Sequence, residues 1–265
     1  MFKIKRFIIL IGAYLVPSKL SAQIARYFLH TIGIGYAVEV EDSGEIRLLH
    51  RLFKKQTPFI LFDVGGNIGK YSSNVCKDFP KAQVHVFEPS RRHFELLQAR
   101  LIIYHERCKT NNFGLGLKDE ELTLYKDSEV TGSATLIKRN LVDCNKILEK
   151  VEVRNLHSYL TNQRIENIDF IKIDVEGWEF PIISTLEFLL AESRINCIQF
   201  EITVNTIENG NNVTDFFNLF EKYGYRIFVV SPSGALNSIS VQDDLARIYL
   251  STNYVAISSC FAIKN

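Results

Sequence analysis

Short apolar segments alternate with amphipathic ones along most of this 265-residue chain, and that alternation constrains its fold more than any other feature. Four of the apolar segments are almost uninterrupted and carry an acidic residue at or next to their end; they span 59–64, 82–89, 168–176 and 194–202. Strands that are buried on both faces read in this way, and the amphipathic segments between them are the helical crossovers of a parallel sheet. The sequence therefore predicts an α/β fold with a mostly parallel sheet and helices on both faces.

Acidic residues stand where a sheet of this kind binds its ligands. In open α/β sheets the ligand lies beyond the carboxyl ends of the strands. The acids at the predicted strand ends are Asp63, Glu88, Asp174, Glu176 and Glu201. We therefore take them as the first candidates for a functional site.

Composition excludes some classes of function. The net charge is +1 and no basic stripe with interleaved aromatic residues is present, which argues against nucleic acid as a partner. The five cysteines are widely spaced with no CxxC pair, and the six histidines form no HxxxH pair, so neither set indicates a metal site. Unpaired thiols are typical of a reducing compartment, and the predicted location is therefore cytoplasmic.

The first sixteen residues of the chain combine a basic start with an apolar run. The basic start "MFKIKR" precedes the ten-residue apolar run "FIILIGAYLV", which is too short to span a bilayer as a helix. Together they resemble the front of a signal peptide, with "KLSA" as a weak cleavage site. The odd number of unpaired cysteines argues against export.

A second amphipathic segment continues this region at helical spacing. Its apolar positions are Leu20, Ile24, Tyr27 and Phe28. We predict an N-terminal helical segment over residues 1–40 and a main domain over residues 41–265. The segment either packs on the domain or contacts a membrane through residues 1–30, which would place the protein peripherally on the inner membrane surface. The sequence does not predict the oligomeric state.

The stretch "FDVGGNIGKYS", residues 62–72, packs three glycines between the first predicted strand and the next helix. A phosphate loop needs a Lys-Ser/Thr pair after its last glycine, whereas Gly69 is followed by Lys70 and Tyr71. The dinucleotide fingerprint GxGxxG also fails, because "GGNIG" is out of step by one residue. The glycines therefore match neither phosphate-binding pattern.

Asp63 stands two residues before the first of these glycines. A carboxylate there would repel a pyrophosphate, but it suits S-adenosylmethionine, which carries a sulfonium and an amino-acid tail and no phosphate. Gly65 and Gly66 would let the backbone approach this ligand closely. Glu88 would accept hydrogen bonds from the ribose hydroxyls, a role that an acid at this place also has in NAD-binding folds. The combination predicts S-adenosylmethionine as the cofactor.

Four stretches carry a family resemblance: "FDVGGNIGKYS", "VFEPSRRHFELL", "IDFIKIDVEGWE" and "IQFEI", in this order and spacing. Over roughly residues 35–260 the chain resembles the FkbM-like methyltransferases. The resemblance implies a class I methyltransferase fold, Rossmann-like, with a seven-stranded and mostly parallel sheet. It also implies methyl transfer from S-adenosylmethionine to a hydroxyl of a sugar, glycan or secondary metabolite. One departure is Gly66, where the family commonly has alanine.

The resemblance also assigns roles to residues. The positions that it implies for the cofactor are Asp63, Gly65, Gly66, Asn67, Gly69, Glu88 and Asn112, with Asn111 as the alternative to Asn112. The turn "TGSAT", residues 131–135, resembles a family segment near the active site.

Asp174 and Glu176 are the candidates for the base that takes the proton of the acceptor hydroxyl. The alternative is that these two acids, with Glu201, hold a divalent cation such as Mg²⁺. In a purely structural interpretation, Glu176 and Glu179 cap the following helix. Lys172 lies inside an apolar strand, and one of these carboxylates is its expected partner.

Two other functions compete with this hypothesis. One is an NAD-dependent sugar-modifying oxidoreductase or epimerase, which the misaligned glycines and the absence of a YxxxK pair disfavour. The other is a non-catalytic Rossmann-like binding module. That the acceptor is a small molecule or a glycan rests on the family resemblance alone.

Overall fold

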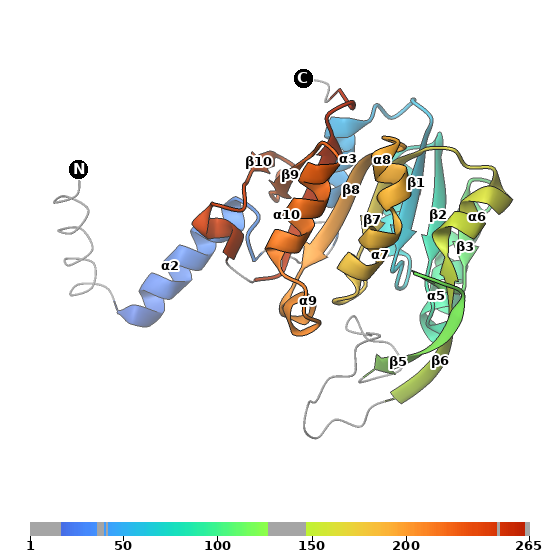
Figure 1. Cartoon of the computed structure of the whole chain (residues 1–265), viewed down its shortest axis with the longest axis horizontal. Helices are drawn as coiled ribbons and strands as arrows, with labels where there is room; N and C mark the ends of the chain where they lie inside the picture. The colour runs from blue at the N-terminus through green and yellow to red at the C-terminus, as the bar shows by residue number, and fades with distance from the viewer. Residues whose placement is uncertain (1–16, 36–39, 41, 127–146, 248–249, 263–265) are drawn as a thin grey trace.

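The computed structural model describes residues 17–35, 40, 42–126, 147–247 and 250–262 (Figure 1). Within them the chain forms one large sheet covered by helices on both faces and a second, smaller sheet. Two segments singled out in the sequence, the apolar run of residues 7–16 and the turn 131–135, lie outside the described residues.

The large sheet has eight strands in the order β10-β9-β11-β8-β7-β1-β2-β3. They are β1 (Phe59–Val64), β2 (Ala82–Phe87), β3 (Cys108–Asn111), β7 (Ile168–Ile173), β8 (Ile195–Ile202), β9 (Tyr225–Val230), β10 (Leu236–Ser238) and β11 (Thr252–Ser258). The five strands from β8 to β3 are mutually parallel, whereas β11 runs antiparallel to both β8 and β9. The predicted mostly parallel α/β sheet is confirmed: seven strands form its body, and the three-residue β10 is added at the edge.

The two faces of the sheet carry separate apolar cores. On one face pack α3 (Glu45–Leu52), α4 (Lys70–Asp78) and α5 (Arg91–Leu101), followed by the short 3₁₀ helix η1 (Ile102–Tyr104). On the other pack α6 (Leu156–Gln163), α7 (Glu179–Thr185), α8 (Glu187–Ala191) and α10 (Val213–Lys222). Leu186 separates the consecutive helices α7 and α8. The remaining short helices are α9 (Val204–Glu208) and η2 (Asp244–Arg247).

The smaller sheet was not predicted. It has the order β4-β6-β5 and consists of β4 (Gly114–Gly116), β5 (Glu120–Lys126) and β6 (Ile147–Asn155). Val151 and Val153 of β6 are buried, and Glu152 and Arg154 between and after them are exposed. This alternation is the mark of a sheet with one face on the core, in contrast to the continuous apolar runs of the large sheet.

The loop after β1 shows why glycine is required there. Gly65 has φ +86°, and a Cβ on it would lie 1.9 Å from the carbonyl oxygen of Asp174 at the end of β7. At Gly66 a Cβ would lie 2.3 Å from Cγ1 of Val86 on β2. Gly65 therefore allows the ends of β1 and β7 to touch, and Gly66 allows the loop to pack on β2.

The N-terminal helix α2 (Ser18–Thr31) projects from the body of the molecule (Figure 1). None of its residues is buried, but the chain that follows it is anchored, because Ile34 is buried in the core. Among the helices that the structure describes, none has the length and apolar character to cross a membrane. The division of the chain into a segment 1–40 and a domain 41–265 stays a prediction.

Gly65→Ala is expected to lower the free energy of unfolding by about 3 kcal/mol or more. The variant combines left-handed backbone strain, about 1–2 kcal/mol, with a collision against backbone that cannot move aside. Gly210→Ala is the matched control, because Gly210 has φ +83° and a Cβ added there would meet no atom within 4 Å. Urea unfolding of the two variants should separate the cost of backbone strain from that of the collision. Equal losses of unfolding free energy in both variants would contradict the close contact between β1 and β7.

Candidate active site

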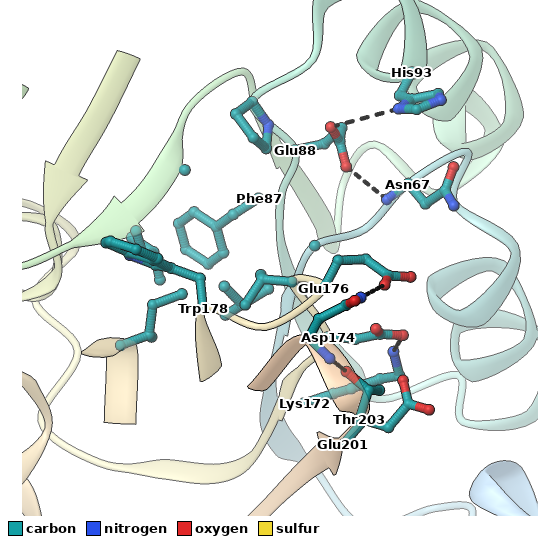
Figure 2. Close-up of a pocket in the computed structure, with 18 of the residues that line it drawn as sticks. Asn67, Phe87, Glu88, His93, Lys172, Asp174, Glu176, Trp178, Glu201 and Thr203 are labelled. Atoms are coloured by element: carbon teal, nitrogen blue, oxygen red, sulfur yellow. Dashed lines mark hydrogen bonds and ion pairs between the residues drawn. The ribbon is translucent and has the colours of Figure 1, made fainter. Parts of the chain in front are cut away.

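A cavity of about 440 Å³ opens at the carboxyl ends of the central strands (Figure 2). Val64, Glu88, Asp174 and Glu201, from the ends of β1, β2, β7 and β8, line it. Leu115 and Leu124 of the smaller sheet cover part of it. Of the five acids singled out at strand ends, Asp63 alone does not line this cavity.

Glu88 is held rigidly by backbone donors on both sides. Its Oε2 accepts a hydrogen bond from the N–H of Asn67 at 2.8 Å, and its Oε1 accepts one from the N–H of Ser90 at 2.8 Å. Asn67 adopts a left-handed conformation, φ +47°, that points its N–H at this carboxylate. Burial raises the pKa of Glu88 to about 8, while the two N–H donors act in the opposite direction. The carboxylate is therefore fixed in direction at the wall of the cavity.

A second carboxylate, that of Glu149, connects the smaller sheet to the chain that follows Glu88. Glu149 of β6 accepts hydrogen bonds from Nζ of Lys126 at 2.7 Å, from the N–H of Arg91 at 2.7 Å and from Oγ of Ser90 at 3.1 Å. Lys126 itself is buried. Neither residue was predicted to matter, because the strand pairing that brings them to the start of α5 is not visible in the local sequence.

The predicted cofactor residues divide into two groups. Gly65, Asn67 and Glu88 line the cavity. The others do not line it and shape the surrounding loops: Asp63, Gly66, Gly69 and Asn112. A direct contact between these four residues and a ligand stays a prediction, and the structure gives each of them a local role instead.

Asp63 lies beneath the glycine loop and is fully buried. Its Oδ2 accepts a hydrogen bond from Oγ of Ser72 at 2.6 Å, and Oδ1 has no hydrogen-bond partner among the described residues. Burial raises the pKa of this carboxyl group. Gly69 forms the left-handed N-cap of α4, and the side chain of Asn112 donates to the carbonyl oxygens of Glu88 and Pro89.

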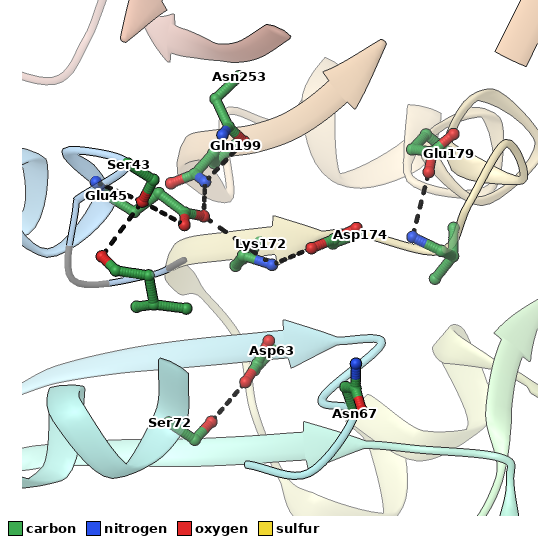
Figure 3. A network of polar contacts seen from close by, with 12 residues as sticks. Ser43, Glu45, Asp63, Asn67, Ser72, Lys172, Asp174, Glu179, Gln199 and Asn253 are labelled. Carbon is green, nitrogen blue, oxygen red and sulfur yellow. Dashed lines mark hydrogen bonds and ion pairs between the residues drawn. The ribbon is translucent and has the colours of Figure 1, made fainter. Parts of the chain in front are cut away.

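A partly buried ion-pair network lines the other end of the cavity (Figure 3). Nζ of Lys172 lies 2.7 Å from Oδ2 of Asp174 and 3.9 Å from Oε1 of Glu45. Glu45 also accepts hydrogen bonds from Gln199 and Ser43. Burial lowers the pKa of Lys172, but the surrounding carboxylates more than offset this and raise it overall. The expected carboxylate partner of Lys172 is Asp174; Glu45, a partner from far upstream, was not predicted.

Glu179 fixes the loop that carries Asp174 and Glu176. It is fully buried; its Oε1 accepts the N–H groups of Val175 at 3.1 Å and Gly177 at 3.0 Å. Burial raises the pKa of Glu179 to about 7. Glu179 thus holds the loop before α7, while Glu176 points elsewhere and accepts a hydrogen bond from Nδ2 of Asn205 at 3.0 Å.

Three carboxylates line the far end of the cavity: Asp174, Glu176 and Glu201. Burial, followed by the charges of Asp174, Glu176 and Glu179, raises the pKa of Glu201 well above its usual value. In the part of the chain that the structure describes, no group of three or more His, Cys, Asp or Glu side chains is arranged to hold a metal ion. The predicted Mg²⁺ site is therefore not supported.

Comparison with known proteins identifies the family. A model described as the methyltransferase FkbM domain matches residues 63–227. The chain belongs to this family. The prediction made from its four motifs is confirmed, and the protein is a methyltransferase. This excludes the hypothesis of an NAD-dependent oxidoreductase.

Two curated relatives carry methyltransferase names. "Methyltransferase 1" of Beauveria bassiana is 23% identical over 192 residues, which cover 66% of this chain and 75% of the relative. "Methyltransferase sdnD" of Sordaria araneosa is 26% identical over 161 residues, 49% of this chain and 61% of the relative. Among solved structures, the precorrin-6y C5,15-methyltransferase of Geobacter metallireducens is 11% identical with a TM-score of 0.46, and the match covers 84% of this chain and 92% of that one.

The family match does not include every wall of the methyltransferase cavity. Glu88, Asp174 and Glu201 lie within residues 63–227. Four other lining residues lie outside this range: Val40, Glu45, Ser251 and Asn253. One part of the site is therefore built by segments that flank the matched domain on both sides.

Glu179→Gln is expected to change how stability depends on pH. Because the pKa of Glu179 is raised in the folded protein, folding favours its protonated form. That contribution is present in full below the unfolded pKa of about 4.3 and is lost as pH rises through about 7. The wild type should therefore lose up to roughly 3 kcal/mol relative to Glu179→Gln between pH 4.5 and pH 8, by the 1.36 kcal/mol per pKa unit of linkage.

Urea unfolding at several pH values measures this difference. Glu95→Gln, on the exposed face of α5, is the matched control and should follow the wild type at every pH. A constant difference between wild type and Glu179→Gln across the range would contradict the raised pKa.

Proposed function

We propose that the protein is an S-adenosylmethionine-dependent O-methyltransferase that acts on a hydroxyl group of a sugar, glycan or other polar metabolite. The observation that carries this proposal is the joining of two features in one cavity. At one end Glu88 is held by backbone N–H groups on both oxygens; at the other lie Asp174, Glu176 and Glu201. Membership of the methyltransferase family supports the reaction class.

The end of the cavity that holds Glu88, which we call the cofactor end, fits a nucleoside with free hydroxyls. The carboxylate oxygens of Glu88 each retain acceptor capacity beyond their one backbone N–H, which suits a pair of neighbouring ribose hydroxyls. Phe87 and Leu115 add apolar surface to the wall beside it, and Gly65 leaves space over the end of β1.

The charge of the cavity favours a cationic ligand over a phosphate. Its described walls carry five acidic side chains and one ammonium, that of Lys172; the acids are Glu45, Glu88, Asp174, Glu176 and Glu201. Burial raises the pKa of Glu88 and of Glu201. A bound sulfonium would favour the ionised forms of these two acids, whereas a pyrophosphate would disfavour them. This supports S-adenosylmethionine independently of Asp63.

S-adenosylmethionine supplies an activated methyl group: the bond from sulfur to the methyl carbon breaks as the acceptor oxygen forms its new bond to that carbon, leaving a neutral thioether. The protein aligns the acceptor and takes the proton that the hydroxyl loses.

Glu201 is the best-suited proton acceptor among the three carboxylates. Its carboxyl group lines the cavity beside Asp174 and Glu176, and burial and the neighbouring carboxylates raise its pKa well above the usual value, so that the ionised group binds a proton more strongly than an exposed carboxylate does. Asp174 is paired with Lys172 at 2.7 Å, which fixes its position. In this proposal Asp174 and Glu176 orient the acceptor; either of them as the base, the prediction from the sequence, remains the alternative.

Polar side chains at the same end supply hydrogen bonds for a hydroxylated acceptor. They are Thr203, Asn205, Ser251 and Asn253. Because Ser251 and Asn253 lie outside the family match, we assign the choice of acceptor in part to the flanking segments.

The protein is expected to bind S-adenosylhomocysteine, and Glu88→Ala to weaken that binding about 100-fold or more. At about pH 9, above the raised pKa of Glu88 of about 8, the variant removes two charge-assisted hydrogen bonds, each contributing about 1.5–3 kcal/mol. Isothermal calorimetry checks this, with Glu95→Ala on exposed α5 as a control of unchanged affinity. If the wild type does not bind S-adenosylhomocysteine, the cofactor assignment is wrong and a non-catalytic binding module is favoured.

Glu201→Gln is expected to lower kcat by about 10²–10⁴-fold, the usual contribution of a positioned base, while binding of S-adenosylhomocysteine is kept. Methyl transfer is measured from labelled S-adenosylmethionine to the glycan and small-molecule fractions of a cell extract, with and without EDTA. Asp174→Asn and Glu176→Gln are compared in the same assay. If the kcat of Glu201→Gln stays within a few-fold of the wild type while that of Asp174→Asn or Glu176→Gln falls further, the residue changed in that variant is the base. If EDTA abolishes methyl transfer by the wild type, the metal hypothesis is supported again.

A further inference from the structure

We propose that α2 docks the enzyme on an anionic membrane surface through an apolar face formed by Leu20, Ile24, Tyr27 and Phe28. This proposal is independent of the reaction and of the cofactor. It concerns a surface that takes no part in the cavity.

The docking face is continuous and has no partner within the described chain. The four side chains are spaced as i, i+4, i+7 and i+8, which places them on one side of the helix. Tyr27 is 78% exposed and Phe28 is 70% exposed, and Leu20 and Ile24 are nearly half exposed. Figure 1 shows that α2 stands away from the sheet and its covering helices. An apolar face of this size on a protein surface marks a contact with something else.

Basic residues border this face. Lys19 and Arg26, two turns apart, lie along one side of α2. The wider sequence has the same bias, because five of the 31 Lys and Arg residues precede Glu39 and no acidic residue does. The remaining 26 basic and 30 acidic residues give the rest of the chain a net charge of −4. An apolar face flanked by cations is the pattern of a helix that lies in the interface of an anionic membrane.

The charge also argues against a second copy as the occupant of the face. In a two-fold symmetric contact each copy presents the same surface to the other. The Lys19 and Arg26 side chains of both copies would then lie near one another without acidic partners on α2. Acidic lipid headgroups supply the missing opposite charge.

The C-terminal end of α2 is joined firmly to the acceptor end of the cavity. Nδ2 of Asn237 donates to the carbonyl oxygen of Ile32 at 3.0 Å, and the N–H of Gly35 donates to Oγ1 of Thr252 at 3.1 Å. Thr252 lies between Ser251 and Asn253, which both line the cavity. A helix bound to a membrane would therefore hold the cavity in a defined orientation to the surface.

Sedimentation of the full chain with lipid vesicles tests the proposal. We expect binding to vesicles of phosphatidylcholine with 30% phosphatidylglycerol, little binding to phosphatidylcholine alone, and loss of binding as salt is added. The double variant Tyr27→Ser/Phe28→Ser should weaken binding at least tenfold. Lys19→Gln/Arg26→Gln should also weaken it and reduce its dependence on salt. Ile103→Ser is the matched control, because Ile103 is 74% exposed on η1, away from α2.

Three outcomes would overturn the proposal. They are no binding of the wild type to anionic vesicles, equal binding of wild type and Tyr27→Ser/Phe28→Ser, and a dimer in light scattering that this variant abolishes. The last outcome would assign the face to a second copy. Because α2 has no buried residue, the variants should keep the melting temperature of the wild type, which shows that any loss of binding is local.

Discussion

Backbone N–H groups at the ends of the parallel strands are bound by buried carboxylates, and the shape of the cavity depends on this. Where a strand ends, its loop loses the ladder of the sheet, and each buried N–H needs another acceptor. Glu88 accepts the N–H groups of Asn67 and Ser90 and so ties the loop after β1 to the loop after β2. Glu179 does the same for Val175 and Gly177 after β7. Loops that would otherwise move are thereby fixed around an open space.

The same arrangement concentrates negative charge at one edge of the sheet. Lys172 is the ammonium that lies among these acids within the described walls, with its Nζ 2.7 Å from Oδ2 of Asp174 and 3.9 Å from Oε1 of Glu45. The preference for a cationic ligand that we propose would therefore come from several residues together. From the sequence we assigned this preference to Asp63, which the structure instead places beneath the loop, where it accepts a hydrogen bond from Ser72.

The sequence pattern within each segment was enough to predict the fold. The features that were missed depend on strands with one solvent-facing side or on contacts between segments that are far apart in the sequence. Nearly continuous apolar runs located the central strands, because a strand buried on both faces is apolar at most of its positions. The acids at their ends located the cavity, because parallel strands end at one edge. The strand β6 was missed although its residues alternate between buried and exposed, because the large sheet was located by continuous apolar runs, which a strand with one solvent-facing side does not have. Glu45 was missed for another reason: it meets Lys172 although the two residues are far apart in the sequence.

The antiparallel strand β11 explains how the flanks of the family domain reach the active site. A strand that ran parallel to β8 would begin at the opposite edge of the sheet. Because β11 runs the other way, its first residues pair with the last residues of β8, and Asn253 lies opposite Glu201. Its neighbour Thr252 binds Gly35, so the chain after α2 is brought to the same edge. The flanks therefore line the end of the cavity that holds Glu201 and connect it to the segment after α2, whereas Glu88 and the loops around it lie within the matched domain.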